Sequence, residues 1–224
     1  MLRTYRRVHL SRQEILRPIR NSTMSFPTPT VEIQTPRLIL RTPVLEDAPS
    51  YLSVFTNPTN YEYEPHKPIN PTVERYERIL TSFAAGTKTG ENAFLSVCLK
   101  GDDGDVVIGN GGFNSIFERG EGEGKVRVGD AGIMIDSAHW RKGYAKEAVA
   151  AMLNWAFHLG EDEVDPKIDV VVFESLAAND RIRGLLSGCF GFKETMSSGD
   201  FGEERVWEIA KSDWEKRRSE MVFE

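Results

Sequence analysis

Apolar and polar positions follow strand-like and helix-like spacings in turn along the first part of the chain. Residues 37–41 alternate weakly between the two kinds, which predicts a strand. A helix is expected over residues 46–56, because two acidic residues fall in its first turn and an Asn-Pro pair ends it. A Pro-rich loop over residues 58–71 follows, and a second helix is expected over residues 72–86 behind a threonine N-cap.

Strand patterns dominate the middle of the chain. Apolar runs bounded by Gly and Asp turns predict three successive strands, at residues 94–99, 106–113 and 125–135. Apolar residues then recur at three- and four-residue steps over residues 143–159, which is typical of an amphipathic helix. Residues 168–173 are almost continuously apolar, as expected of a strand that is covered on both faces.

A shorter helix at residues 179–190 and two strands at residues 192–196 and 205–209 complete the pattern. This order predicts one mixed α/β domain, whose central mixed sheet has about six to seven strands with helices on both faces. The strand, helix and strand between residues 125 and 173 should form a right-handed crossover with the two strands parallel. The expected organisation is a basic, disordered extension at 1–30, the domain at 31–212 and a charged C-terminal tail at 213–224.

The composition is that of a globular protein without a membrane span. Of the 224 residues, 40% are hydrophobic and 28% charged, and no apolar run approaches the length of a spanning helix. The formal net charge of -6 argues against nucleic acid as a partner, because phosphate binders carry a basic excess. Cys98 and Cys189 lack metal-ligand spacing, so we expect two buried thiols, no metal site and a reducing compartment.

Residues 1–23 differ from the rest of the chain. They contain six arginines and a single acid, Glu14. An amphipathic mitochondrial transit segment has such a composition. A disordered basic extension, or an upstream stretch that translation from Met24 would omit, is the plainer explanation. The cytoplasm is therefore the expected location, and the mitochondrion is the alternative.

The clearest chemical signal is the junction at residues 136–148, where a strand ends and a helix begins at Gly143. Such a junction leaves backbone N–H groups without helical partners at the positive end of the helix dipole, which makes it an anion site. Gly143 lets the backbone come close to a phosphate, and Ala145 keeps the next turn uncrowded. Positive charge is added by the side chains of Arg141, Lys142 and Lys146. A diphosphate fits this arrangement better than a single carboxylate.

This junction resembles the acetyl-CoA loop of the GCN5-related N-acetyltransferase (GNAT) family, particularly the branch of the ribosomal-protein alanine acetyltransferases. Segments 35–41, 129–135 and 179–192 also resemble that branch, in the same order along the chain. The sequence departs from the pattern at Arg141, where the branch usually has Gly. It also departs at residues 183–186, where many members place a tyrosine as the acid for the thiolate.

The resemblance implies a GNAT-like fold and acetyl-CoA as the co-substrate, without a metal. It implies that the backbone of Ile133, Met134 and Ile135 pairs with the pantetheine arm. The strands ending near Ile135 and Phe173 should splay to admit this arm, and Asn179 should contact the cofactor from the next helix. The residues implied to hold the diphosphate are Arg141, Lys142, Gly143, Tyr144, Ala145 and Lys146.

Acetyl transfer to an amine requires a base, because an alkyl amine with a pKa of about 10.4 is mostly protonated at neutral pH. Asp130 occupies the acidic strand position that the branch commonly fills with Glu, and Glu174 follows the next strand. We favour Asp130 as the base, acting directly or through water, with Glu174 second. A solvated strand acid and a loop carboxylate are the plain alternatives for the two residues.

We therefore expect an acetyl-CoA-dependent N-acetyltransferase that acts on a primary amine by direct attack in a ternary complex. Peptide or protein N-termini and small-molecule amines stay open as acceptors, with residues 61–66 and 197–201 framing their pocket and Glu62 and Glu64 attracting a cation. The alternative, favoured by the missing tyrosine, is a non-catalytic acyl-CoA-binding sensor or scaffold of the same fold. We expect no nucleic-acid or membrane partner, and a monomer or homodimer.

Overall fold

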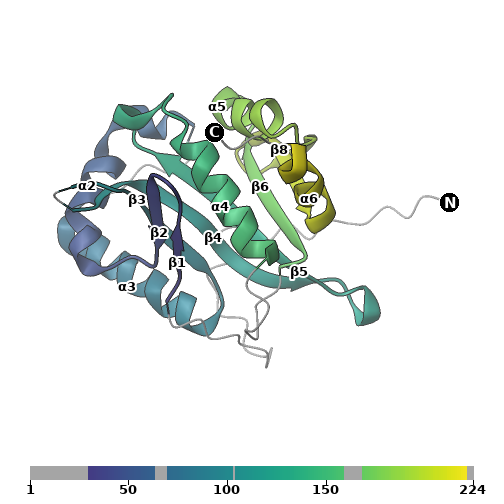
Figure 1. The fold of residues 1–224 in the computed structure, drawn as a ribbon, viewed down its shortest axis with the longest axis horizontal. Coiled ribbons are helices and arrows are strands. Elements are labelled where there is room, and N and C mark those ends of the chain that lie inside the picture. The colour runs from purple at the N-terminus through teal and green to yellow at the C-terminus, as the bar shows by residue number, and fades with distance from the viewer. Residues whose placement is uncertain (1–29, 64–69, 103, 159–167, 221–224) are drawn as a thin grey trace.

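An eight-stranded sheet forms the centre of the protein, with the strand order β1-β2-β3-β4-β5-β6-β8-β7 (Figure 1). The computed structural model describes residues 30–63, 70–102, 104–158 and 168–220, so nearly all of the expected basic extension lies outside it. The strands are β1 Glu32–Gln34, β2 Leu38–Arg41, β3 Ala93–Leu99, β4 Val106–Arg119, β5 Val126–Ile135, β6 Val170–Leu176, β7 Thr195–Gly199 and β8 Gly202–Ala210.

Helices cover both faces of this sheet, which confirms the predicted mixed α/β class. One face carries α2 and α3, and the other carries α4 with the C-terminal helices (Figure 1). Among the described residues, none of the helices is long and apolar enough to cross a bilayer. The helices are α2 Ala48–Thr56, α3 Val73–Thr89, α4 Tyr144–His158, α5 Asp180–Arg183 with a π-helical continuation Gly184–Cys189, and α6 Lys211–Glu220.

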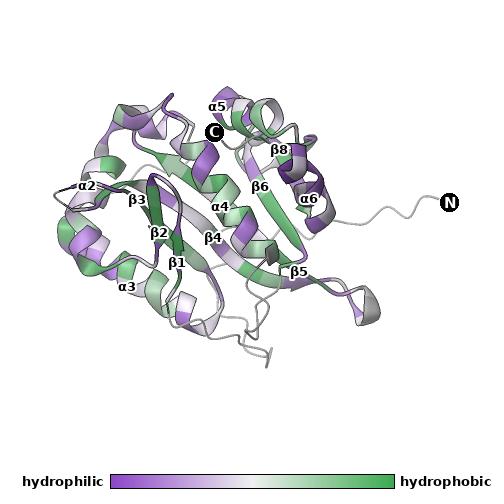
Figure 2. Ribbon diagram, in the orientation of Figure 1, coloured by the Kyte–Doolittle hydropathy of each residue, from purple (hydrophilic) through white to green (hydrophobic). Residues whose placement is uncertain are grey.

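Helix α4 is held by the apolar stripe that its sequence predicts. Its residues Ala148, Val149, Met152 and Leu153 are fully buried in the larger core, together with strand residues from β2 to β8. Trp155 stacks on Phe113 of β4, with ring centroids 5.5 Å apart. Figure 2 accordingly shows β2 and β6 largely in the hydrophobic colour. This packing fixes the start of α4 beside the end of β5.

A buried polar network holds the start of α2 on the opposite face. The Asp47 carboxylate accepts two hydrogen bonds from Arg41, at 2.8 and 2.7 Å, and one from Ser96 Oγ at 2.7 Å. Tyr51 Oη lies 3.1 Å from the same Ser96 hydroxyl. Burial alone would raise the pKa of Asp47, but the hydrogen bonds from Arg41, Ser96 and Val44 N outweigh it and lower that pKa.

The sheet has more strands than the expected six to seven. Strand β1 was not anticipated, because three residues are too few to show a period. Strand β4 runs to Arg119 instead of residue 113, past an irregularity between Phe113 and Ser115 that breaks the alternation. Helix α6 crosses the expected start of the charged tail at residue 213. It is largely purple in Figure 2, yet it buries Trp214 completely.

Strands β5 and β6 are parallel, as the predicted crossover requires, but they pair over a short distance only. Their register begins at Val128 with Val170 and ends at Ala131 with Phe173. Both strands continue, to Ile135 and Leu176. The sheet therefore opens between the two carboxyl ends, next to the start of α4.

Candidate functional site

The turn between β5 and α4 is tied to the segment that follows α2. Asn60 Oδ1 accepts a hydrogen bond from Ser137 N at 2.9 Å, and Asn57 Nδ2 donates to Ser137 Oγ at 2.9 Å. Asp136 Oδ1 accepts from Asn60 Nδ2 at 3.3 Å and from Ala138 N at 3.4 Å. These contacts fix the backbone on the β5 side of the turn without using the amides on its helix side.

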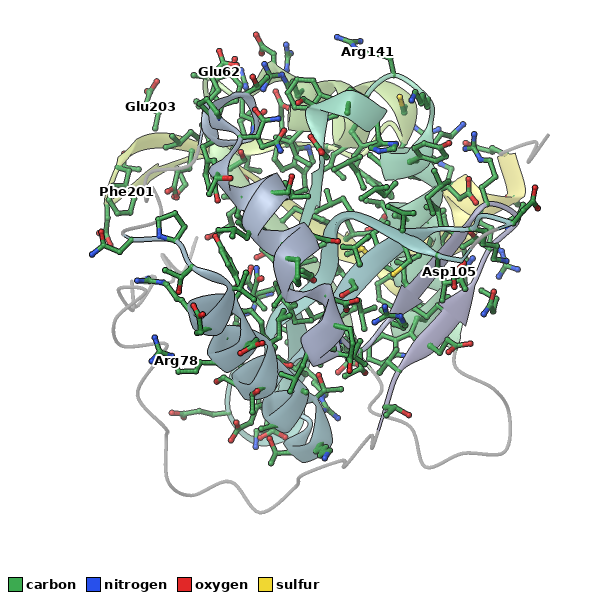
Figure 3. All side chains as sticks on the ribbon, turned by 90° about the vertical axis from the view of Figure 1, so that its left-hand side faces the viewer. Glu62, Arg78, Asp105, Arg141, Phe201 and Glu203 are labelled. Atoms are coloured by element: carbon green, nitrogen blue, oxygen red, sulfur yellow. The ribbon has the colours of Figure 1, made fainter. Side chains whose placement is uncertain are left out.

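The second half of the turn has left-handed backbone at Arg141 and Gly143, with φ of 63° and 82°. The side chain of Arg141 points away from the protein into solvent (Figure 3). Glu147 N donates to Gly143 O at 3.1 Å in the first turn of α4, so helical geometry leaves the preceding amides without helical partners. The exposed basic residues around these amides are Arg141, Lys142 and Lys146. The arrangement suits an anion, as the sequence predicts.

Thr35 and Arg37 brace this turn through Glu147. Both belong to segment 35–41, which the sequence analysis named only for its resemblance to a family. Glu147, in the first turn of α4, accepts hydrogen bonds from Thr35 Oγ1 at 2.6 Å, Arg37 N at 2.9 Å and Arg37 Nε at 2.7 Å. Burial opposes ionisation of Glu147, but these bonds outweigh it and hold its pKa below the ordinary value. Arg37 Nη1 also donates to Lys142 O at 2.9 Å. The β1–β2 turn is thereby fastened to the turn between β5 and α4.

Residues of β5 point alternately to the two faces of the sheet beside the opening. Ala131, Ile133 and Ile135 belong to the core under α4. Asp130 and Met134 therefore face the opposite side. Trp140 Nε1 donates to Ile135 O at 2.5 Å, so one of the backbone groups expected to meet pantetheine already has a partner.

The two candidate bases lie on the same face of the sheet. Asp130 is opposite Val172 in the register of β5 and β6, and Glu174 follows two residues later on β6. Asp130 is half-buried and Glu174 is exposed. Two carboxylates on neighbouring strands thus border the point where the strands separate, on the side away from α4.

Arg181 of α5 spans the opening. Its guanidinium lies over the Trp140 ring, 4.2 Å from the centroid, and over the Tyr63 ring at 5.2 Å. It also forms an ion pair with Glu62. Sequence reasoning missed this cluster, because its members come from three distant segments and no local pattern joins them. Glu64 and His66, which were expected near the acceptor, lie outside the described residues.

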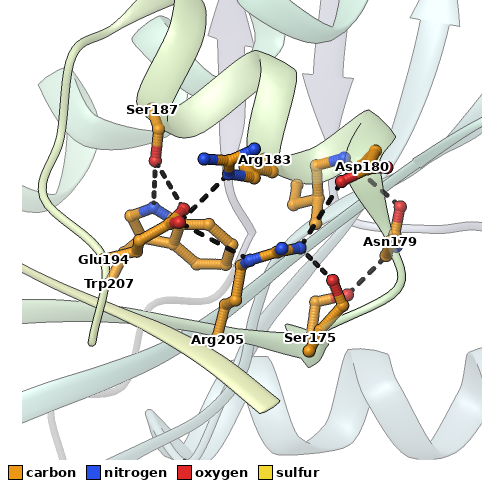
Figure 4. Close-up of polar contacts among 10 residues, drawn as sticks. Ser175, Asn179, Asp180, Arg183, Ser187, Glu194, Arg205 and Trp207 are labelled. Carbon is orange, nitrogen blue, oxygen red and sulfur yellow. Dashed lines mark hydrogen bonds and ion pairs between the residues drawn. The ribbon is translucent and has the colours of Figure 1, made fainter. Parts of the chain in front are cut away.

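Asn179 is the N-cap of α5. Its Oδ1 accepts from Ile182 N at 3.3 Å and its Nδ2 donates to Ser175 Oγ at 3.0 Å. Figure 4 places it beside an ionic network in which Arg205 lies 3.5 Å from Glu194 and 3.6 Å from Asp180. The side-chain amide is thus used within the chain, and its expected contact with a cofactor stays a prediction.

The cysteines have different environments. Cys98 is buried, and its burial raises the pKa of the thiol to about 11. Cys189 is exposed, so the expectation of two buried thiols is wrong for this residue. It is exposed because it lies at the end of the π-helical stretch, on the side that faces solvent. Among the described residues, no group of three or more His, Cys, Asp or Glu side chains is placed to hold a metal ion.

Comparison with known proteins gives one family and one fold. The family described as "Acetyltransferase (GNAT) domain" matches residues 37–192. RimJ of Mycobacterium smegmatis, solved in complex with CoA-disulfide, is similar with a TM-score of 0.68 and 17% identity, over 87% of this chain and 95% of that chain. No protein among the curated ones matches this sequence.

Two further solved structures have a similar fold. The microcin C7 self-immunity acetyltransferase MccE, in complex with acetyl-CoA and AMP, has a TM-score of 0.64 and 12% identity, over 79% of this chain and 93% of that chain. An acetyltransferase from Bacillus anthracis has a TM-score of 0.61 and 17% identity, over 81% and 99% of the two chains. At these identities the similarity concerns the fold alone.

Proposed function

This chain belongs to the GNAT acetyltransferase family, and from that premise we propose that it transfers an acetyl group from acetyl-CoA to a primary amine by direct attack in a ternary complex. GNAT acetyltransferases use acetyl-CoA, and membership of the family favours an enzyme over the non-catalytic sensor or scaffold. The observation that carries the proposal is the opening between β5 and β6 beside the start of α4.

The donor site follows from this geometry. The backbone of Ile133, Met134 and Ile135 lies beyond the last residue of β5 that pairs with β6, where the pantetheine arm can take the place of a strand. The diphosphate lies on the first turn of α4, where backbone amides and the helix dipole favour an anion. The residues proposed to surround it are Arg141, Lys142, Gly143, Tyr144, Ala145 and Lys146.

In the reaction the amine nitrogen attacks the thioester carbonyl on the side of the sheet that bears Asp130. Asp130 takes the proton from the amine, directly or through water, and Glu174 is the second candidate for this role. The new C–N bond forms as the C–S bond breaks, and CoA leaves as a thiolate that takes up, through solvent, the second proton that the nitrogen loses as the amide forms. The enzyme contributes alignment and proton removal, because a thioester is already activated.

The acceptor is an N-terminal amine of a peptide or protein, or a small-molecule amine. The resemblance of residues 35–41 and 129–135 to the ribosomal-protein alanine acetyltransferases favours the first class. We place the enzyme in the cytoplasm. The mitochondrial alternative, which rests on the arginines of residues 1–23, is tested by the location of a full-length fluorescent fusion.

The function is tested with the purified full-length protein in two steps. Calorimetry should detect binding of CoA, and a thiol-release assay with acetyl-CoA and a panel of N-terminal peptides, polyamines, amino acids and amino sugars should detect turnover. Mass spectrometry then identifies the acetylated product. A folded protein that takes up no CoA would contradict the donor site. Tight CoA binding without turnover across the panel would favour the sensor.

A further inference from the structure

The peptide bond between Lys142 and Gly143 is held by Arg37 on its carbonyl side. Its carbonyl oxygen accepts the hydrogen bond from Arg37 Nη1 at 2.9 Å. In a trans peptide the C=O and the following N–H point in opposite directions. The Gly143 N–H therefore points away from Arg37. It points out of the turn, toward the place where the diphosphate is proposed to bind.

The guanidinium that holds this carbonyl is itself fixed on several sides. Arg37 Nε donates to Glu147 Oε2 at 2.7 Å, and its Cζ lies 4.8 Å from the centre of the Tyr144 ring. A side-chain carbon added at Gly143 would come within 3.2 Å of Arg37 Nη2, so the guanidinium lies directly against the turn. Thr35 Oγ1 keeps Glu147 in place with a bond of 2.6 Å.

Glu147 lies in the first turn of α4, where the helix dipole favours a carboxylate but also favours a bound anion. A carboxylate in the first turn of α4 repels an anion that binds to the same helix end. Its oxygens, however, accept bonds from Thr35 and Arg37, and its side chain is only 14% exposed. The Glu147 carboxylate therefore holds the Arg37 guanidinium in place, and the guanidinium holds the backbone of the turn in place.

We propose that Arg37 and Glu147 are positioning residues for diphosphate binding: Glu147 fixes the Arg37 guanidinium, which keeps the Lys142 carbonyl turned away and the Gly143 amide directed at the phosphate. This inference rests on the proposed function, because it concerns the same donor site. Neither residue belongs to the group of side chains proposed above to surround the diphosphate.

The first test replaces Arg37 and compares two acetyl donors. Arg37→Gln removes the guanidinium hydrogen bonds to Glu147 and to the Lys142 carbonyl. We therefore expect calorimetry to give a Kd for CoA about tenfold higher. Acetyl-pantetheine lacks the diphosphate, and kcat/KM with it should stay unchanged. Arg37→Lys keeps the charge but cannot reach both Glu147 and the Lys142 carbonyl in the same way, so it should restore little of the affinity.

The second test depends on the sign of an effect. Glu147→Gln removes a negative charge close to the diphosphate, and electrostatics alone would tighten CoA binding. Loss of positioning would instead weaken it, and we expect weaker binding, by about tenfold. In the double variant Arg37→Gln with Glu147→Gln, the two losses should be clearly less than additive, because both act through the same peptide bond.

Arg217→Gln is the matched control. Arg217 also reaches across to the backbone carbonyl of a left-handed glycine, with a bond of 3.1 Å to Gly191 O, and also pairs with a glutamate, Glu220, at 2.8 Å. It lies outside the donor site, so its loss should leave the Kd for CoA unchanged. Thermal unfolding of each variant confirms that it is folded.

The outcomes separate this inference from the function on which it rests. If the unaltered protein binds no CoA, the proposed function fails and the inference fails with it. If the protein binds CoA but Arg37→Gln binds it equally well, or Glu147→Gln binds it more tightly, the positioning role of the two residues is contradicted. The proposed function then still stands. An equal loss with CoA and acetyl-pantetheine would indicate a general structural role and would also overturn it. Should Arg37→Gln not fold, Glu147→Gln carries the test by itself.

Discussion

At the scale of single residues, Asp130 has the position that a base for the attacking amine requires. It is half-buried at the last stretch of β5 that pairs with β6, and its side chain points away from α4. Glu174 shares that face but is exposed. The half-buried residue is therefore the better candidate, since a group held in place by its surroundings is more readily aligned with a substrate.

Replacing Asp130 by Asn should lower kcat by about a hundredfold or more, because the amide cannot accept the proton. The loss should be largest at acidic pH, where the largest share of the amine is protonated. Acetyl-CoA binding should be unaffected. A pH series of kcat measured for both proteins checks this, and an unchanged profile would remove Asp130 from the mechanism. Glu174→Gln, prepared alongside, tests the second candidate.

Arg141 has the backbone conformation that explains why related sequences usually place Gly there. Its φ of 63° is in the left-handed region, which costs a non-glycine residue about 1 kcal/mol. The sequence marked the position as a departure from the pattern. It did not indicate the conformation, because the turn is imposed by bonds from Arg37, Asn57 and Asn60, which lie far away in the chain.

At the scale of elements, the start of α2 depends on one buried ion pair. Asp47 is 4% exposed and is bonded to Arg41, Ser96 and the amide of Val44. Removal of one partner from a buried pair leaves an uncompensated charge. We expect Asp47→Asn to lower the free energy of unfolding by about 3 kcal/mol, measured by urea denaturation at neutral pH.

The sign of the pH dependence follows from the lowered pKa of Asp47 in the folded protein. Its contribution is complete above the unfolded value of about 3.9 and is lost as the pH falls through the lower folded value. The difference between the two proteins should therefore shrink in acid below about pH 4. Arg119→Gln breaks an exposed pair with Glu208 and, as the control, should cost less than about 1 kcal/mol.

Trp214 is the buried side chain that anchors helix α6 to the domain. Trp214 is 0% exposed, donates to Asn154 Oδ1 at 3.0 Å and meets Phe190 edge to face at 6.0 Å. We expect Trp214→Ala to lower the free energy of unfolding by about 3 kcal/mol or more, against less than about 0.5 kcal/mol for the exposed Lys216→Ala. Urea denaturation of both variants checks this. Equal effects would mean that α6 is a tail, as its charged composition first predicted.

How far the elements could be predicted depends on their periodicity. Helix α4 and the strands of the middle of the chain were placed within a few residues, apart from the C-terminal end of β4, since their apolar spacing is regular. Strand β1 and helix α6 were not. The first is too short to have a period, and the second buries a single tryptophan in an otherwise charged sequence.

At the scale of the whole molecule, the fold class and the position of the turn between β5 and α4 could be derived from the sequence, because both rest on local pattern and on the connection rule for parallel strands. The remainder of the site could not. Glu62, Trp140 and Arg181 meet only after β5, β6 and α5 are assembled, and nothing in their local sequence indicates the contact. Local patterns locate a backbone turn, and tertiary packing decides which side chains meet at it.

The short ladder between β5 and β6 has a mechanical consequence. In the described residues, the ladder between β5 and β6 has four residue pairs, with one more backbone bond from Asp169 N to Arg127 O, and it joins the half of the sheet built from β1 to β5 to the half built from β6 to β8. A donor molecule that pairs with the β5 backbone beyond Ala131 would add a connection between the two halves of the sheet. Binding of the donor would then couple the two halves and raise the temperature at which they separate. The rise should be larger when the donor binds more tightly.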